Sequence, residues 1–123
     1  MSVNDFTDYP KRLLCRLTQT GVLAPVISSV IINTLGVLPV MSYSAVGSYV
    51  GAFPLAVMKL GQSRVQFWSG NGNQYLVFNS ILTGSSATNF TLTTNDPSTG
   101  NGADGGIGSA AGTAAWLEIM VYP

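Results

Sequence analysis

The stretch Trp116-Leu117-Glu118-Ile119-Met120-Val121-Tyr122 alternates between two kinds of side chain. Because successive residues of a β-strand point to opposite faces, Leu117, Ile119 and Val121 form one aliphatic stripe that faces a core. The opposite face carries Trp116, Glu118, Met120 and Tyr122. That second face is too apolar for open water. The stretch therefore predicts a strand in a sheet that is covered on both sides, with another subunit as the second cover.

The rest of the chain has the same short-strand character. No stretch of helical length shows the amphipathic period of a helix, and glycine and proline recur between runs rich in Val, Ile, Thr, Tyr and Phe. We predict strands over 11–19, 26–33, 37–44, 46–53, 55–59, 63–69, 73–78, 88–94 and 114–122. Short strands at this spacing favour an all-β fold, a single antiparallel β-sandwich of jelly-roll kind.

The chain has 123 residues, the length of one domain, and shows neither an internal repeat nor a linker. Residues 11–123 are predicted to form the single β-sandwich domain. Residues 1–10 contain two acids, few apolar side chains and Pro10, which favours extended chain. We expect them to form an N-terminal arm that lies outside the core and contacts a neighbouring subunit.

The strongest local turn signal is Asn71-Gly72, which stands between two aromatic-rich runs. An Asn-Gly pair fits the tight turn of a hairpin, because both positions need positive φ. This hairpin would pair Trp68 with Tyr75, Phe67 with Leu76 and Val65 with Phe78. Trp68 and Tyr75 would then share the outer face. Such an aromatic patch fits a subunit interface, and it also fits stacking on a sugar ring; we favour the interface.

Charge is scarce. Hydrophobic residues make up 46% of the chain and charged residues 8%, with five basic and five acidic side chains that cancel. No basic surplus exists to neutralise phosphates, so nucleic acid is not an expected partner. Residues 18–57 contain no charged side chain at all. Because exposed strand edges of free monomers usually carry charges, we expect this surface to be covered by neighbouring subunits.

The segment Val22–Met41 has twenty residues without a charge, enough for a helix to cross a bilayer. Pro25, Gly36 and Pro39 interrupt it, and its flanks lack the basic bias of a membrane helix. The β-branched residues of 26–33 fit a buried strand better. We therefore expect no membrane span.

Residues suited to chemistry are few. The chain has no histidine, and its single cysteine, Cys15, stands in an apolar alternation that predicts a buried thiol. Asp96 and Asp104 lie in the glycine-rich segment 95–112, which we expect to be an exposed loop. That loop faintly resembles a calcium-binding repeat, but such sites need stacked copies. We predict no enzymatic activity, no cofactor and no metal.

Several motifs resemble small β-rich proteins encoded by Bacteroidetes genomes and by viruses of those bacteria. They are YPKRLLCRLTQTG at 9–21, AP at 24–25, NTLG at 33–36, VGSYVGAF at 46–53 and LEIMVYP at 117–123. The similarity spans most of the chain and is weakest over 59–115. The family brings no known active site. The resemblance implies a component of a virion or of another surface structure.

These observations together predict a non-enzymatic phage structural protein that decorates or builds the capsid, a vertex or a spike. It would be made in the host cytoplasm, since no secretory signal is seen, and would act in the virion as a homo-oligomer, a trimer, alongside other virion proteins. The candidate interface consists of Trp116, Glu118, Met120, Tyr122, Trp68 and Tyr75, with Glu118 paired to Arg16 or Arg64. One alternative is a lectin-like module that binds a receptor or host-surface glycan through Trp68, Tyr75 and residues 95–112. Another is a cell-surface or secreted bacterial protein.

Overall fold

The computed structural model of the chain describes residues 10–58, 63–68, 76–81 and 88–122. Its strands are β1 (Lys11–Thr18), β2 (Val26–Asn33), β3 (Val40–Ala45), β4 (Ser48–Ala52), β5 (Ser63–Trp68), β6 (Leu76–Ile81), β7 (Asn89–Asn95) and β8 (Ala115–Val121). The one helix within these ranges is the 3₁₀ turn η2 (Ala111–Thr113). No helix in this part of the chain is long and apolar enough to cross a membrane. The predicted arm, apart from Pro10, lies outside the described residues.

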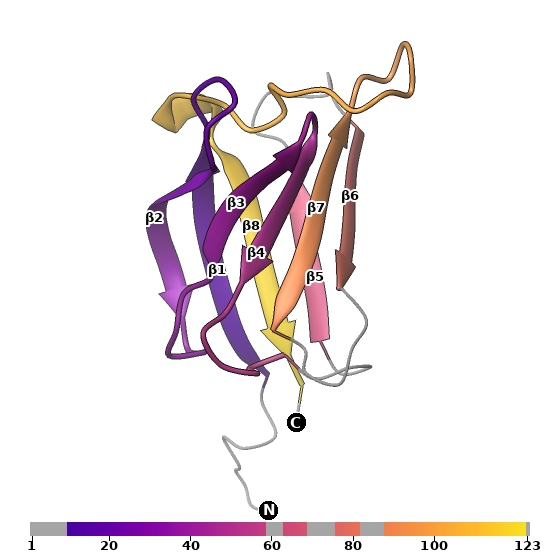
Figure 1. The fold of residues 1–123 in the computed structure, drawn as a ribbon. Helices are drawn as coiled ribbons and strands as arrows, with labels where there is room; N and C mark the ends of the chain where they lie inside the picture. The colour runs from indigo at the N-terminus through magenta and orange to yellow at the C-terminus, as the bar shows by residue number, and fades with distance from the viewer. Residues whose placement is uncertain (1–9, 59–62, 69–75, 82–87, 123) are drawn as a thin grey trace, which may run out of the picture.

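The strands form two four-stranded antiparallel sheets that pack face to face (Figure 1). Sheet A has the order β2-β1-β8-β5, and sheet B has the order β3-β4-β7-β6. The pairs β1–β2, β3–β4 and β6–β7 are consecutive in the chain and stay within one sheet, whereas the other connections cross between the sheets. The predicted all-β, antiparallel sandwich is confirmed.

The core lies where the alternating stripes of the two sheets meet. Sheet A contributes Leu13, Cys15 and Leu17 from β1 and the predicted stripe of β8, all of them buried. Sheet B contributes Tyr49 from β4 and two β7 residues, Phe90 and Leu92, which are also buried. The predicted burial of Cys15 beside Leu13 and Leu17 is confirmed.

The buried thiol of Cys15 gives a prediction for alkaline solution. Burial raises its pKa from 9.0 to about 12. An unfolded chain therefore ionises at Cys15 above pH 9 while the folded chain does not. The stability contributed by the neutral thiol is complete below pH 9 and is lost as pH rises toward 12, at about 1.4 kcal/mol per pH unit.

We expect urea unfolding to show that the native sequence loses about 1 kcal/mol of stability between pH 9 and 10 and that Cys15→Ala loses less. Above pH 10 both proteins should lose stability, since burial also raises the pKa of Tyr49 to about 12. Equal slopes for the two proteins between pH 9 and 10 would mean that the thiol is not the group that titrates.

The expected hairpin between 65 and 78 is wrong. β5 pairs with β8 in sheet A, so that Val65 lies opposite Ile119 and Phe67 opposite Leu117, while β6 pairs with β7 in sheet B. The turn residues Asn71 and Gly72 lie outside the described residues. The aliphatic stripe of β8 offers β5 a long-range partner with matching burial, and this pairing outweighs the local turn signal.

The strand expected over 55–59 is also not found. Residues 53–57 form a bend, in which the Val57 N–H donates to the Leu55 carbonyl oxygen at 2.9 Å, and Met58 makes only an isolated bridge. A three-residue turn of this kind takes up the backbone groups that a strand would need. Lys59 lies outside the described residues.

β2 differs most from its predicted environment. The sequence favoured a buried strand over 26–33, and the strand has these bounds, but it lies at the end of sheet A with β1 on one side only. All but two of its residues are exposed. In the single chain, a strand with the composition of a core strand is therefore largely exposed to solvent.

Candidate functional site

The outer face of sheet A is built by the residues between the core stripes. Strand pairing lines them up in rows across β1, β8 and β5. The first row is Arg16, Trp116 and Trp68; the second is Leu14, Glu118 and Gln66; the third is Arg12, Met120 and Arg64. Five of the six predicted interface residues therefore fall on or beside this face. The sixth, Tyr75, lies outside the described residues.

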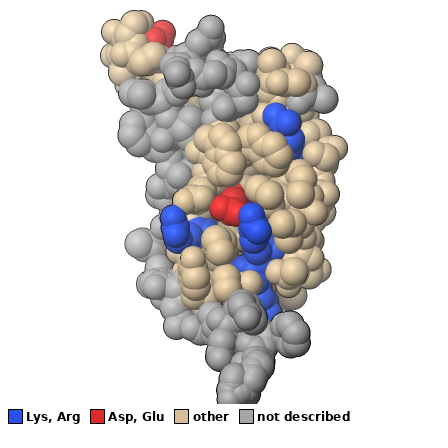
Figure 2. Space-filling view, turned by 180° about the vertical axis from the view of Figure 1, so that it is seen from behind, with Lys and Arg blue, Asp and Glu red and all other residues tan. Residues whose placement is uncertain are grey.

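Glu118 holds a polar network at the centre of this face. Arg12 Nε donates to Glu118 Oε2 at 2.7 Å, and the Glu118 side chain is only 13% exposed. With the Gln66 amide oriented to satisfy both neighbours, its nitrogen donates to Glu118 Oε1 at 3.0 Å and its oxygen accepts from Arg64 at 2.7 Å. Figure 2 shows the acidic group between basic ones.

The expected partner of Glu118, Arg16 or Arg64, is therefore wrong: its partner is Arg12. Arg64 reaches the carboxylate only through Gln66. Arg16 instead lies over the Trp116 ring, with its Cζ 4.4 Å from the ring centroid, and donates to the Ala114 carbonyl oxygen at 2.6 Å. The cation–π contact and this hydrogen bond hold the Arg16 guanidinium away from Glu118.

Two tryptophans stack at one end of the same face. The ring centroids of Trp68 and Trp116 are 6.2 Å apart, and the ring planes meet at 19°. Trp68 is 41% exposed, while Trp116, Met120 and Tyr122 are half-buried by their own neighbours. The alternation in β8 thus has the predicted sense, with these three residues on the face opposite the core stripe.

A second apolar surface lies along β2. Val26 is 60% exposed and Ile31 is 48% exposed, and the exposed Val22 and Leu23 precede the strand. No charged residue interrupts the sequence from 18 to 57. The composition of 26–33 predicted a buried strand, and the charge-free run predicted a surface covered by neighbouring subunits. The edge position of β2 follows only from the strand order of sheet A.

The glycine-rich segment is fastened to the end of sheet B by Asp104. Its Oδ2 accepts from the Tyr43 hydroxyl at 2.8 Å, and its Oδ1 accepts from the Gly47 N–H at 2.9 Å and the Tyr49 hydroxyl at 3.1 Å. Gly47 has φ of 71°, and a Cβ there would overlap the Thr94 carbonyl oxygen. This close approach lets the turn between β3 and β4 dock against the segment.

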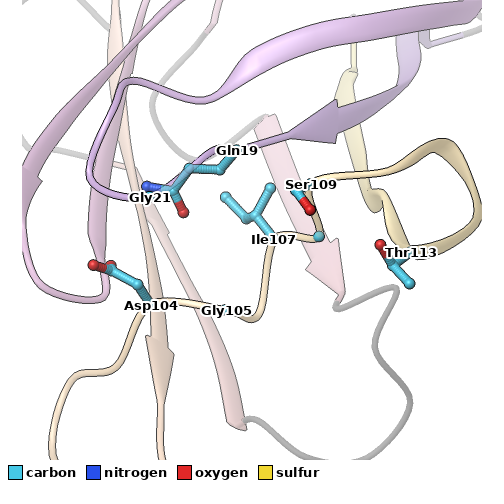
Figure 3. Close-up of a pocket in the computed structure, with 8 residues that line it drawn as sticks. Gln19, Gly21, Asp104, Gly105, Ile107, Ser109 and Thr113 are labelled. Carbon is cyan, nitrogen blue, oxygen red and sulfur yellow. The ribbon is translucent and has the colours of Figure 1, made fainter.

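The expectation that residues 95–112 are exposed holds only for part of them. Residues 97–102 are exposed, but 106–108 are buried, and Ile107 belongs to the core with 2% exposure. A hollow of about 530 Å³ is lined by residues 104–105, 107–109 and 113 and by the turn after β1. Figure 3 shows the Ile107 side chain among these lining residues, between Gln19 and Ser109. The Gln19 amide in its wall donates to the Leu23 carbonyl oxygen at 3.0 Å.

The carboxylates in the described ranges, Glu118, Asp104 and Asp96, are held by structural contacts. Glu118 binds Arg12, and Asp104 binds two tyrosines. The hydroxyl and N–H of Ser98 bind Asp96 and lower the pKa of its carboxyl. No group of three or more His, Cys, Asp or Glu residues in this part of the chain is placed to hold a metal ion. What these surfaces offer is packing and stacking.

No protein-family model, no curated protein and no solved structure matches the chain.

Proposed function

We propose that the chain is a non-catalytic structural subunit that acts by assembling with copies of itself. The observation that carries this proposal is β2: a charge-free, β-branched strand at the edge of sheet A, exposed on both faces. Left in water, an apolar edge can pair with other chains, and natural monomers commonly protect theirs with charged side chains, which β2 does not have. An assembly that covers β2 removes the exposed apolar surface.

The outer face of sheet A is the second proposed contact. Trp116, Met120 and Tyr122 present an apolar surface there, and Trp68 extends it. Tryptophan, tyrosine and methionine are enriched in protein interfaces. The network of Glu118 is satisfied within the chain, so a partner that covers this face meets no unpaired carboxylate.

The test of self-assembly is the mass of the full chain in solution. Size-exclusion chromatography with light scattering at micromolar concentration should give a multiple of 12.9 kDa. A trimer is the expected multiple if two different surfaces meet around a ring, whereas a surface that meets its own copy gives two-fold pairs. A monomer at this concentration contradicts the proposal.

The setting we propose is a phage virion, where the protein would decorate or build the capsid, a vertex or a spike together with other virion proteins. The support is the motif resemblance over 9–53 and 117–123. Mass spectrometry of gradient-purified particles from a culture that carries the gene should find the chain at a fixed copy number per particle. Its absence from particles, with the chain present in the cell fraction, would leave an assembly protein of another setting.

A second candidate is a glycan-binding module, favoured by one observation, the stacked pair of Trp68 and Trp116 with Trp68 exposed. A sugar ring could stack on the open indole, and Gln66 is the next residue of β5 on the same face. A glycan array should then give hits that Trp68→Ala removes. Leu55→Ala, a change at a similarly exposed apolar residue elsewhere, should keep them. An empty array with folded protein removes this candidate.

A further inference from the structure

We propose that β2 is a contact between two copies: the β2 strands pair antiparallel about a two-fold axis and join two copies of sheet A into one continuous sheet. This inference rests on the self-assembly proposed above and names its contact surface, and such a two-fold contact gives an even number of copies in place of the trimer expected from the sequence. The partner is a second copy of this chain.

The first support is the open side of β2. In Figure 1 the strand lies at the margin of the sandwich, and β1 is its partner in sheet A. The backbone N–H and C=O groups on the far side of an edge strand are free to pair with another strand. The other end of sheet A is protected, because β5 carries the exposed Arg64 and contacts β6 of the facing sheet.

The second support is the amount of apolar surface. Val26, Val30 and Ile31 are exposed along the strand, and Val22 and Leu23 extend the surface at one end. These side chains lie along and beside one edge strand, so a second copy that covers it removes them from water together.

The third support is charge. In an antiparallel pair about a two-fold axis, residues near the axis lie opposite their own copies, so a charged residue there would meet a like charge. β2 has no charged residue, and neither do the segments that flank it in the sequence. Ser28 and Ser29, in the middle of the strand, are small enough to let the two backbones approach.

The ladder between β1 and β2 locates the axis. It shifts register at two points, so that Ser28 and Ile31 have no opposite residue on β1. Such bulges bend an edge strand and shorten the run that can pair regularly. The regular run between them is Ser29-Val30, opposite Arg16 and Cys15. We therefore place the two-fold axis beside Ser29 and Val30.

The first experiment adds a charge to the edge of the full-length chain. Ile31→Lys should weaken association at least about tenfold in light scattering, since each copy would bring a lysine near the axis. Val46→Lys, at a comparably exposed valine on the turn between β3 and β4, should leave the mass unchanged. Circular dichroism and urea unfolding of both variants check that the fold is kept.

The second experiment places single cysteines at Ser28, Ser29 and Val30. Mild oxidation should link two copies through at least one of these positions, because only residues beside a two-fold axis lie opposite themselves. Ser98→Cys, exposed in the glycine-rich segment, should stay unlinked. A wild-type chain that assembles while Ile31→Lys keeps its mass and no β2 cysteine cross-links overturns this contact and leaves self-assembly standing. A monomeric wild-type chain overturns the proposed function itself.

Discussion

Gly51→Ala should destabilise the protein by about 3 kcal/mol, an effect at the upper end of those seen when a packed core is overfilled. Gly51 is buried in β4 and lies opposite Phe90 of β7. The Phe90 ring covers the glycine so closely that an added Cβ would overlap it. Phe90 is fully buried, and its ring centroid lies 5.9 Å from that of Phe53. The Phe90 ring therefore has little room to move away.

Urea unfolding at fixed protein concentration measures this loss, since association would otherwise shift the midpoint. Gly112→Ala is the matched control: no atom lies within 4 Å of a Cβ built there, and the change should stay within about 0.5 kcal/mol. Adding Phe90→Leu to Gly51→Ala should recover part of the loss, because the smaller side chain leaves space for the methyl group. A loss below 0.5 kcal/mol for Gly51→Ala alone would show that the ring does not occupy this position.

Asp104→Ala should cost about 2–3 kcal/mol and release the glycine-rich segment from sheet B. The change removes one carboxylate that accepts hydrogen bonds from the Tyr43 and Tyr49 hydroxyls and the Gly47 N–H. The Tyr49 hydroxyl is left with Thr94 Oγ1 at 3.3 Å. Ile107, held in the core by the docked segment, would become exposed.

Limited proteolysis separates this local release from general unfolding. Cleavage within 96–110 should rise in Asp104→Ala at urea concentrations where β1 and β8 stay folded. Asp96→Ala is the control: it removes a carboxylate of the same segment that binds only the exposed Ser98 turn, and it should leave the cleavage rate of the docked part unchanged. Equal cleavage of both variants would mean that Asp104 does not fasten the segment.

The sequence predicted those features of the fold that depend on neighbouring residues, and it did not predict which distant strands pair. In β1 and β8 each residue alternates strictly between core and surface, so burial and face could be predicted for Cys15 and Leu117 alike. The Asn71-Gly72 signal predicted the wrong pairing because a turn preference stabilises a hairpin less than the pairing of two core-facing strands does. The partner of β5 is β8, which lies about fifty residues further along the chain.

For the candidate site, the sequence predicted which residues share the outer face of sheet A, but it did not predict which side chains contact one another. Alternation placed Trp116 and Glu118 on the outer face, but three arginines could reach the carboxylate, and only the register of β1 against β8 puts Arg12 within 2.7 Å of it. Composition suggested that 26–33 is covered, and the charge-free run suggested neighbouring subunits as the cover, which remains a prediction. The edge position of β2 could not be predicted locally, because strand order is set by the whole sandwich.

The contact between two copies through β2 is tested most directly by amide hydrogen exchange over residues 22–33, measured at protein concentrations above and below the midpoint of association. If β2 is covered by a second copy, the β2 amides that point away from β1 should exchange slowly in the assembled protein and quickly after dilution, while the amides of β1 and β8 stay protected in both. Ile31→Lys should show the fast exchange at every concentration. If β2 exchanges as fast in the assembled wild-type protein as in the diluted chain, β2 is not the contact between copies.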